Sequence, residues 1–349
     1  MKAAVLEKYN QIIWQDVPDP KIKKGNEVLI KIKYAGICGS DQHVFKGEFH
    51  PRTHVPFIQG HEFAGTIIET GKSVTKFKTG DRVAVDPIIW CGKCAACQIH
   101  HYPACTSLKL IGIDQDGAFA EYVIAEEFQL FKIPDNITDR DAALIEVFAI
   151  GFHACKRAEV TENDTIAIWG GGRIGQCILQ AAKTKTDKTI FIVDILDERL
   201  EIISKHFSNV VCINATKQNP IKVIKEKTGD RGVDIAFEAV GHAKSIPEMP
   251  NPIQCCIDSI RGAGKVTVLG LSDEPADLKI KQLIWKEGKI ITSRVSHGEF
   301  GEAILHLSKG DLNPEALISA EFDASEAQKA FEMLEEEPGK YLKILLKLH

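Results

Sequence analysis

The pattern that sets the fold class lies in residues 166–194, IAIWGGGRIGQCILQAAKTKTDKTIFIVD. A short apolar run at 166–169 is long enough for a buried strand, and GGGRIG at 170–175 follows it as a G-x-G-x-x-G. Apolar residues then repeat at helical spacing, and a second apolar run at 190–193 ends in Asp194. This order of strand, glycine turn, helix, strand and acid predicts a dinucleotide-binding unit.

The three glycines of the G-x-G-x-x-G pattern have separate predicted tasks. Gly170 would allow the tight turn, Gly172 the approach of a pyrophosphate, and Gly175 close packing of the helix on the strand. The helix N-terminus, at Arg173 and Ile174, would face the phosphates. The alternative is an ordinary strand–helix–strand turn that binds no ligand.

Asp194 favours NAD over NADP as the dinucleotide. It lies about 20 residues beyond the turn, where an acid accepts hydrogen bonds from the adenosine ribose and repels a 2′-phosphate. Ile195 and Leu196 offer no cation for such a phosphate, but Arg199 is close enough to keep NADP open.

Length and composition indicate a soluble protein of two domains. The chain has 349 residues, more than the roughly 250–300 at which one core stops growing. Its net charge of −5 argues against a nucleic-acid partner. No apolar run approaches the roughly 18 residues of a membrane span, and the N-terminus lacks a signal-peptide core. We therefore expect a cytoplasmic protein whose ten cysteines are mostly reduced.

The β-rich N-terminal part carries candidate ligands for a catalytic zinc. Cys38 lies in GICGSDQH at the end of a predicted strand, and His61 and Glu62 lie in a glycine-flanked turn before another. Glu146 is an acid inside the apolar segment at 142–156, predicted to be one buried helix, and it needs a partner there. A thiolate, an imidazole and one or two carboxylates suit a zinc with an open position. A salt-bridged core glutamate is the alternative for Glu146.

A second metal site is predicted in the only dense group of cysteines. Four thiols within fifteen positions can close a tetrahedral sphere around zinc, and an iron–sulfur cluster is the competing interpretation. The predicted role is to stiffen a surface lobe. The ligands are Cys91, Cys94, Cys97 and Cys105.

Beyond Asp194, short apolar strands alternate with helical segments, which predicts a parallel sheet and an α/β domain. Arg294 follows the last of these strands. Its guanidinium could hold a cofactor phosphate or a substrate carboxylate, and an ordinary surface arginine is the alternative.

The chain resembles zinc-dependent medium-chain dehydrogenases from end to end. The resemblance rests on G-H-E-x2-G-x5-G-x2-V at residues 60–74, on the four cysteines and on the G-x-G-x-x-G, in that order. It implies a GroES-like β-barrel catalytic domain and a doubly wound Rossmann domain that binds NAD. We place the catalytic domain at 1–151, with the zinc lobe at about 86–110. The Rossmann domain is placed at 152–293 and the return to the catalytic domain at 294–349.

Within that family, the set Cys38, His61, Glu62 and Glu146 resembles the polyol and threonine dehydrogenase branch. GICGSDQH, VDPIIWCGKC, GIDQDGAFAEY, LIEVFAI and TSRVSHGEF are most similar to L-gulonate, L-galactonate and L-idonate 5-dehydrogenases. Two features depart from the family. Arg173 stands where proline is frequent, and the segment at 246–252 is rich in proline.

The resemblance implies an enzyme with two zinc ions per chain and NAD. Zinc would lower the pKa of a bound substrate hydroxyl, and the nicotinamide would take the hydride. Ser40 and His43 would form a proton relay with the nicotinamide ribose, for which histidine suits because its ordinary pKa is about 6.5. Val268 to Gly270 would lie at the nicotinamide edge.

The expected reaction is oxidation of a secondary alcohol in a sugar acid. A polyol or L-threonine dehydrogenase is the near alternative, since the branch motifs do not separate the substrates. A non-catalytic regulator that binds NAD as a signal is the alternative of another class. Family members are commonly dimers or tetramers, so a homo-oligomer is expected.

Overall fold

The computed structural model describes residues 1–241, 249–272 and 275–348 and divides the chain into two compact units. Unit 1 comprises Met1–Ala149, Ser296–Gly310 and the chain from Leu317 onward. Unit 2 comprises Ile150–Val295 and Asp311–Ala316. No helix in the described ranges is long and apolar enough to cross a membrane.

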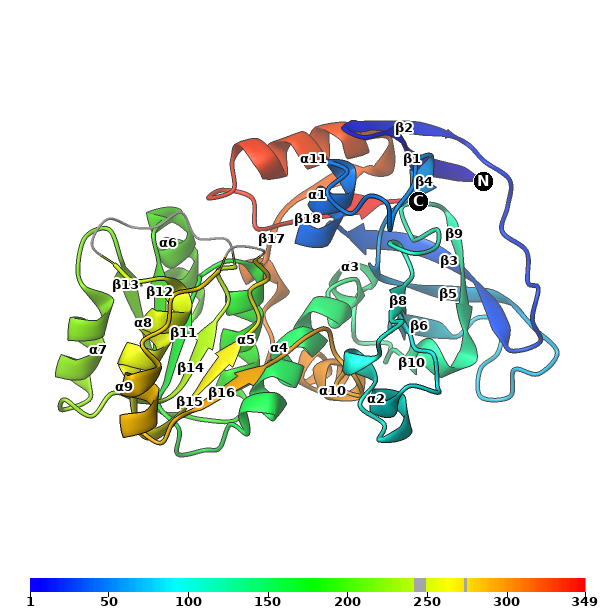
Figure 1. Ribbon diagram of the computed structural model, residues 1–349. Coiled ribbons are helices and arrows are strands. Elements are labelled where there is room, and N and C mark those ends of the chain that lie inside the picture. The colour runs from blue at the N-terminus through cyan, green and yellow to red at the C-terminus, as the bar shows by residue number, and fades with distance from the viewer. Residues whose placement is uncertain (242–248, 273–274, 349) are drawn as a thin grey trace. The chain divides into compact units, whose positions relative to one another are not determined.

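Unit 1 is built mainly from β-strands (Figure 1). Its largest sheet has the order β10-β6-β5-β3-β18-β17, with β9 also paired to β3. A three-stranded sheet has the order β2-β1-β4, and β7 pairs with β8. The strands are β1 (Lys2–Lys8), β2 (Gln11–Asp16), β3 (Glu27–Gly36), β4 (Phe57–Ile58), β5 (Glu62–Thr70), β6 (Arg82–Val85), β7 (Ile88–Ile89), β8 (Lys109–Leu110), β9 (Tyr122–Glu126), β10 (Leu130–Lys132), β17 (Ile318–Asp323) and β18 (Lys343–Lys347).

Helices of unit 1 are mostly short. They are α1 (Gly39–Phe45), α2 (Ala95–Gln98), α3 (Asp139–Ala142), α10 (Phe300–Lys309) and α11 (Ala327–Glu336), with 3-10 turns η1 (Tyr102–Ala104), η2 (Glu127–Gln129) and η4 (Ala324–Glu326). Helix α4 (Ile145–Ala158) begins in unit 1 and contains the division between the units.

The central strand β3 shows why unit 1 has one dominant core. Val28, Ile30 and Ile32 are fully buried on one face, because side chains alternate across a strand. Phe331 of α11 packs against Phe119 at a ring-centroid distance of 6.0 Å, which closes this core from the C-terminal side.

Strand register brings three distant segments to the same end of the large sheet. In the antiparallel pair of β3 and β5, Gly36 lies opposite Glu62. Strand β18 runs along the other edge of β3, with Leu345 opposite Gly36. The residues just beyond Gly36, around Glu62 and at the start of β18 are therefore neighbours.

Unit 2 is a six-stranded parallel sheet flanked by helices (Figure 1). The order β13-β12-β11-β14-β15-β16 confirms the doubly wound Rossmann topology. Strands β11 and β12 are buried along their whole length, as parallel strands covered on both faces are. The strands are β11 (Ile166–Trp169), β12 (Ile190–Asp194), β13 (Val210–Asn214), β14 (Val233–Glu238), β15 (Ile260–Val268) and β16 (Lys289–Thr292).

The helices of unit 2 follow its strands in alternation. They are α5 (Arg173–Lys183), α6 (Asp197–His206), α7 (Pro220–Lys227), α8 (Pro252–Ser259) and α9 (Ile280–Trp285), with the 3-10 turn η3 (Pro314–Ala316). Pro252 occupies the first turn of α8, where its missing N–H costs nothing, and Asn251 caps the helix by accepting from Gln254 N. The remainder of the proline-rich segment, at 246–248, lies outside the described residues.

The buried helix predicted at 142–156 is confirmed as α4 from Ile145 onward, but its start differs. Ala142 ends the short helix α3, and the chain turns at residues 143–144 before α4 begins. Thr138 caps α3 by accepting from Asp141 N, and Leu144 N then donates to Asp141 O in a tighter turn. Glu146 consequently lies in the first turn of α4.

Candidate functional site

Cys38 and His61 are brought together by the loops that follow β3 and precede β5. Cys38 lies at the N-terminal end of α1, and its backbone N donates to Asp41 Oδ2 at 2.8 Å. His61 is buried, with 3% of its surface exposed. The sulfur of Cys38, one ring nitrogen of His61 and one carboxylate oxygen of Glu62 all lie within 4.8 Å of one another. The structure thus gathers three of the four predicted ligands.

Asp41 orients the His61 ring from behind. Asp41 is fully buried, and its Oδ1 lies 3.5 Å from His61 Nδ1. The other ring nitrogen, Nε2, lies 3.4 Å from Ser40 Oγ. A carboxylate behind one imidazole nitrogen is the usual support of a metal-binding histidine, since it directs the other nitrogen toward the metal.

Glu62 is held by a lysine from the other end of the chain. Lys343 Nζ lies 2.5 Å from Glu62 Oε2, and both side chains are completely buried. The same ammonium donates to Ile37 O at 3.1 Å. Glu62 Oε1 has no hydrogen-bond partner within the described part of the chain, so one carboxylate oxygen stays available.

Glu146 lies near the group of three without joining it. Its side chain is buried, and among the residues that the structure describes Oε2 has no hydrogen-bond partner. Burial and then the Glu62 carboxylate raise the pKa of Glu146 well above its usual value. Its role as a direct or water-mediated ligand stays a prediction.

The charges of this cluster fit a cation. Burial acts to lower the pKa of His61, but Asp41 and Cys38 outweigh it and raise that pKa well above the usual value. The same negative neighbours that raise this pKa would also favour a bound metal cation. Thiolate, imidazole and carboxylate are the donors of a zinc that keeps an open position, so zinc suits this donor set.

The predicted relay residues differ in their surroundings. Ser40 is half-buried beside His61. His43 lies one turn further along α1, and its side chain is 44% exposed. Its Nδ1 contacts the Glu48 carboxylate, a partner that the sequence did not reveal.

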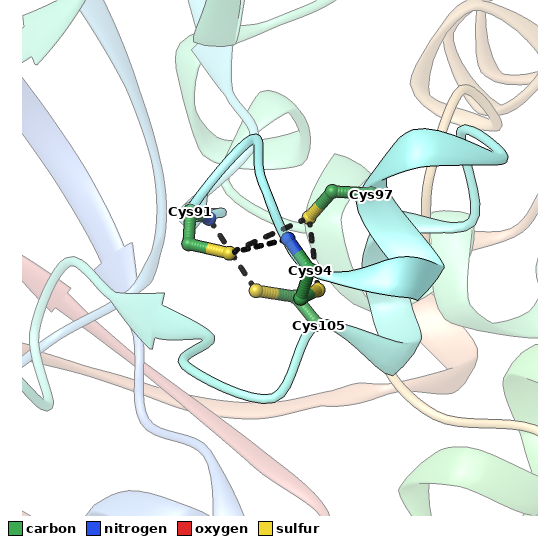
Figure 2. A group of neighbouring side chains, drawn as sticks. All are labelled: Cys91, Cys94, Cys97 and Cys105. Carbon is green, nitrogen blue, oxygen red and sulfur yellow. Dashed lines mark hydrogen bonds between the residues drawn. The ribbon is translucent and has the colours of Figure 1, made fainter.

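The four cysteines of the lobe converge on one point (Figure 2). Cys91 follows β7, Cys94 precedes α2, Cys97 lies within α2 and Cys105 follows η1. Their sulfur atoms all lie within 4.8 Å of one another.

Distances within this group fit a tetrahedral zinc. Sulfurs bound at about 2.3 Å to one zinc would lie about 3.8 Å apart. The Cys91–Cys97 and Cys94–Cys97 sulfur pairs are 3.9 and 3.5 Å apart. Backbone N–H groups of Thr106 and Cys97 lower the pKa of the Cys94 thiol to about 6, whereas burial and then the Cys94 thiol raise the pKa of Cys97 to about 12. The thiolate that zinc binds is thus favoured at Cys94. The four cysteines therefore fit the structural zinc that the sequence predicted.

The glycine turn in unit 2 has the geometry expected for close packing. Gly170 adopts φ +106°, a left-handed conformation that favours glycine. A Cβ on Gly175 would lie 1.7 Å from Gly170 O, so no larger residue fits. Gly172 caps α5, which begins at Arg173 and continues through Ile174.

Asp194 closes this turn from the end of β12. Its Oδ2 accepts from Gly171 N at 2.7 Å, and its Oδ1 accepts from Ile195 N at 2.7 Å. Arg199 Nη1 lies 3.3 Å from Asp194 Oδ2. The guanidinium that left NADP open in the sequence is thus engaged by the predicted ribose ligand.

Of the remaining predicted cofactor residues, Val268 ends β15, Gly270 lies in the loop that follows it, and Arg294 lies in the loop after β16. Val268 and Gly270 are half-buried, and Arg294 is exposed. The sequence did not indicate Glu238, which is 2% exposed at the end of β14. Its carboxylate accepts from Gly241 N at 3.0 Å and Gly270 N at 3.1 Å, which joins two loops at this edge of the sheet.

Sequence reasoning also missed Asp41 and Lys343. Asp41 could have been suspected from its place between Ser40 and His43. Lys343 carried no signal, because a lysine at the start of a C-terminal strand is ordinarily solvated.

Comparison with known proteins identifies the family. Residues 24–135 match the alcohol dehydrogenase GroES-like domain, and residues 174–309 match the zinc-binding dehydrogenase family. The starvation-sensing protein RspB of Escherichia coli K12 is 33% identical, with 99% of each chain covered. Sorbitol dehydrogenase of Bacillus subtilis is 35% identical, covering 99% of this chain and 97% of that protein.

A solved structure shows the same fold over the whole chain. The rspB short chain alcohol dehydrogenase of E. coli CFT073, complexed with NADH, superposes with a TM-score of 0.89 at 33% identity. The match covers 100% of this chain and 99% of that one. The chain therefore belongs to the zinc-dependent medium-chain alcohol dehydrogenases, oxidoreductases that use zinc and a nicotinamide dinucleotide.

Proposed function

We propose that the protein oxidises a secondary alcohol of a sugar acid and passes the hydride to NAD. The observation that carries this proposal is the buried group of Cys38, His61 and Glu62, whose ligand atoms lie within 4.8 Å of one another. When bound there, zinc would supply a Lewis acid that lowers the pKa of a substrate hydroxyl, and bound NAD would accept the hydride.

The protein's own residues have separate tasks in this proposal. Cys38, His61 and Glu62 hold the metal, and Glu146 holds it directly or through water. Ser40 and His43 move the hydroxyl proton toward solvent. In unit 2 the turn from Gly170 to Gly175, with the N-terminus of α5, holds the pyrophosphate. Val268 and Gly270 contact other parts of the cofactor, and Arg294 holds either a cofactor phosphate or the substrate carboxylate.

We infer NAD rather than NADP from the contacts of Asp194. Its carboxylate would repel a 2′-phosphate, and the cation nearest to it, Arg199, already pairs with it at 3.3 Å. An adenosine 2′-hydroxyl is neutral and can share an acceptor site of the carboxylate, whereas a 2′-phosphate would place a second negative charge beside it.

A polyol is the second candidate substrate. The relative that favours it is the sorbitol dehydrogenase of B. subtilis, at 35% identity over nearly the whole of both chains. The sugar-acid proposal rests on the sequence segments quoted above and on a cation, Arg294, that is exposed. Either substrate places a secondary alcohol on a polyhydroxylated chain.

The test is NADH formation at 340 nm with zinc-replete protein. The panel holds L-gulonate, L-galactonate, L-idonate, sorbitol and L-threonine, each with NAD and with NADP. Turnover of an aldonate with NAD is the expected result. Turnover of sorbitol or L-threonine alone would show that the substrate is a polyol or an amino acid and not a sugar acid. The absence of turnover with every substrate would favour a non-catalytic NAD-binding regulator. Metal analysis should find about two zinc ions per chain.

We also propose a homo-oligomer that pairs through unit 2. Strand β16 is the edge of the parallel sheet, and Ile284 and Trp285 of the neighbouring α9 are 65% and 78% exposed. An uncovered strand edge beside large apolar side chains suits a second copy of the chain. Light scattering should give a dimer or larger for the native chain, and Trp285→Glu should shift it toward the monomer. A monomeric native chain would refute this.

A further inference from the structure

The end of helix α1 places an acid on the predicted relay histidine. Glu48 N donates to His43 O at 2.9 Å, and Gly47 N donates to Val44 O at 3.0 Å. These two bonds form a Schellman motif, the common ending of a helix. The chain reverses through this motif, and the Glu48 carboxylate returns to contact His43 Nδ1.

Gly47 makes this return possible. It adopts φ +79°, where residues with a Cβ are strained. A Cβ there would also lie 2.9 Å from the ring of Tyr9. Backbone conformation and space therefore both fix the turn, and Glu48 does not reach His43 by side-chain flexibility alone.

A second contact fixes the plane of the imidazole. The Phe49 ring lies nearly parallel to it, with an interplanar angle of 8° and a centroid distance of 5.8 Å. The nearby cation of the same turn, Lys46, is engaged elsewhere, 2.7 Å from Glu335. Glu48 is thus the charged group that His43 contacts directly, and both side chains reach water, being 44% and 51% exposed.

We propose that Glu48 is a positioning residue of the proton relay, which sets the tautomer of His43. An ionised carboxylate has only acceptor sites, so the contacted Nδ1 must carry the proton. The lone pair of the neutral ring is then on Nε2, which becomes the proton acceptor. This inference rests on the proposed function, because it gives His43 its direction within that relay.

Protons balance in this step. His43 Nε2 takes the proton that the alcohol releases, and the ring becomes an imidazolium whose Nδ1–H still donates to Glu48. The imidazolium then returns the proton from Nε2 to water or buffer. Glu48 takes no proton in this step, as is the case for the carboxylate that orients the histidine of a catalytic triad.

Nuclear magnetic resonance of the full-length, zinc-replete protein tests the tautomer without turnover. With ¹⁵N-labelled histidine at pH 8, the His43 signals, assigned with His43→Asn, should show the proton on Nδ1. Glu48→Ala should move it largely to Nε2, whereas Glu48→Gln keeps an acceptor and should preserve Nδ1–H. Glu335→Gln is the matched control, since it removes a carboxylate of similar exposure, 46% against 51%. An unchanged tautomer in Glu48→Ala would refute the proposal.

Turnover supplies the second measurement, with sorbitol and L-gulonate as probes. Glu48→Ala should lower kcat about two- to fivefold in dilute buffer, the effect expected of an exposed ion pair. Added imidazole should restore the rate, because it takes the proton directly, and KM should change little. A loss that imidazole does not relieve would mean that Glu48 has only a structural role. If the native protein turns over neither probe, the proposed function is in question while the tautomer result stands.

Discussion

The two metal sites of this protein are assembled in different ways. The cysteine lobe takes all its ligands from fifteen consecutive positions, 91–105, and backbone N–H groups of the same segment donate to the sulfurs. The cluster of Cys38, His61 and Glu62 takes its ligands from two strand ends. Its supporting cation, Lys343, comes from the last strand, 281 residues beyond Glu62.

This difference separates a site that stabilises a segment from one that reacts. Local ligands with matched sulfur distances close a coordination sphere and leave no open position. The buried cluster instead depends on charges that balance only when the whole of unit 1 is folded. Damage to the lobe should therefore appear first in stability, and damage to the cluster first in activity.

The largest effect is expected at Cys38. Cys38→Ser should lower kcat roughly a thousandfold or more, because the Lewis acid that stabilises the developing charge is lost. Zinc content should fall by about one ion per chain, and NADH affinity, measured by fluorescence titration, should stay nearly unchanged. Equal loss of turnover and cofactor binding would contradict the division of labour between the two units.

The corresponding change in the lobe should act on stability. Cys97→Ser should lower the free energy of unfolding by roughly 4–5 kcal/mol, as loss of a structural metal does. Denaturant unfolding with and without chelator measures this. The chelator should destabilise the native protein and have little further effect on the variant. A Cys97→Ser variant with native stability but no turnover would contradict the structural role assigned to the cysteine lobe.

Lys343→Met tests the long-range support of the cluster. It should cost roughly 3–5 kcal/mol of stability, because the buried Glu62 Oε2 then loses its ion pair with the lysine. Lys343→Arg should retain most of the stability. The double variant Lys343→Met with Glu62→Gln should be more stable than Lys343→Met alone. Independent, additive effects of the two substitutions would show that the pair is not coupled.

The smallest expected effect is on the pH dependence of stability and comes from Asp86, a buried acid for which the contacts described include no cation. Burial raises the pKa of Asp86 to about 7, and Glu299 adds to the rise. The unfolded chain, with its pKa near 3.8, binds fewer protons in this range, so stability should fall as pH rises toward 7. Between pH 5.5 and 8, Asp86→Asn should remove about 1–3 kcal/mol of that fall. The exposed Asp135→Asn is the control, and an identical pH profile for both variants would contradict the assignment.

Local patterns made much of the protein predictable. The turn at 170–175, β12 and Asp194 form a contiguous unit, so their spacing predicted a dinucleotide-binding unit. The alternation of strands and helices beyond Asp194 predicted the parallel sheet. The four-cysteine site was equally predictable, because all four ligands lie in one short segment that can wrap around a metal ion. The start of the helix predicted at 142–156 was placed three residues too early, since apolar periodicity does not reveal the turn at Leu144.

Only the tertiary structure decided which side chains support the reactive ones. Cys38, His61, Glu62 and Glu146 could be named from residue type, and Ser40 and His43 from the resemblance to the family. That Asp41 stands behind His61, Lys343 against Glu62 and Glu48 against His43 follows from strand register and a helix ending. Spacing in sequence records contacts within a segment, whereas these contacts depend on how separate segments pack, and a buried charge acquires its partner only then.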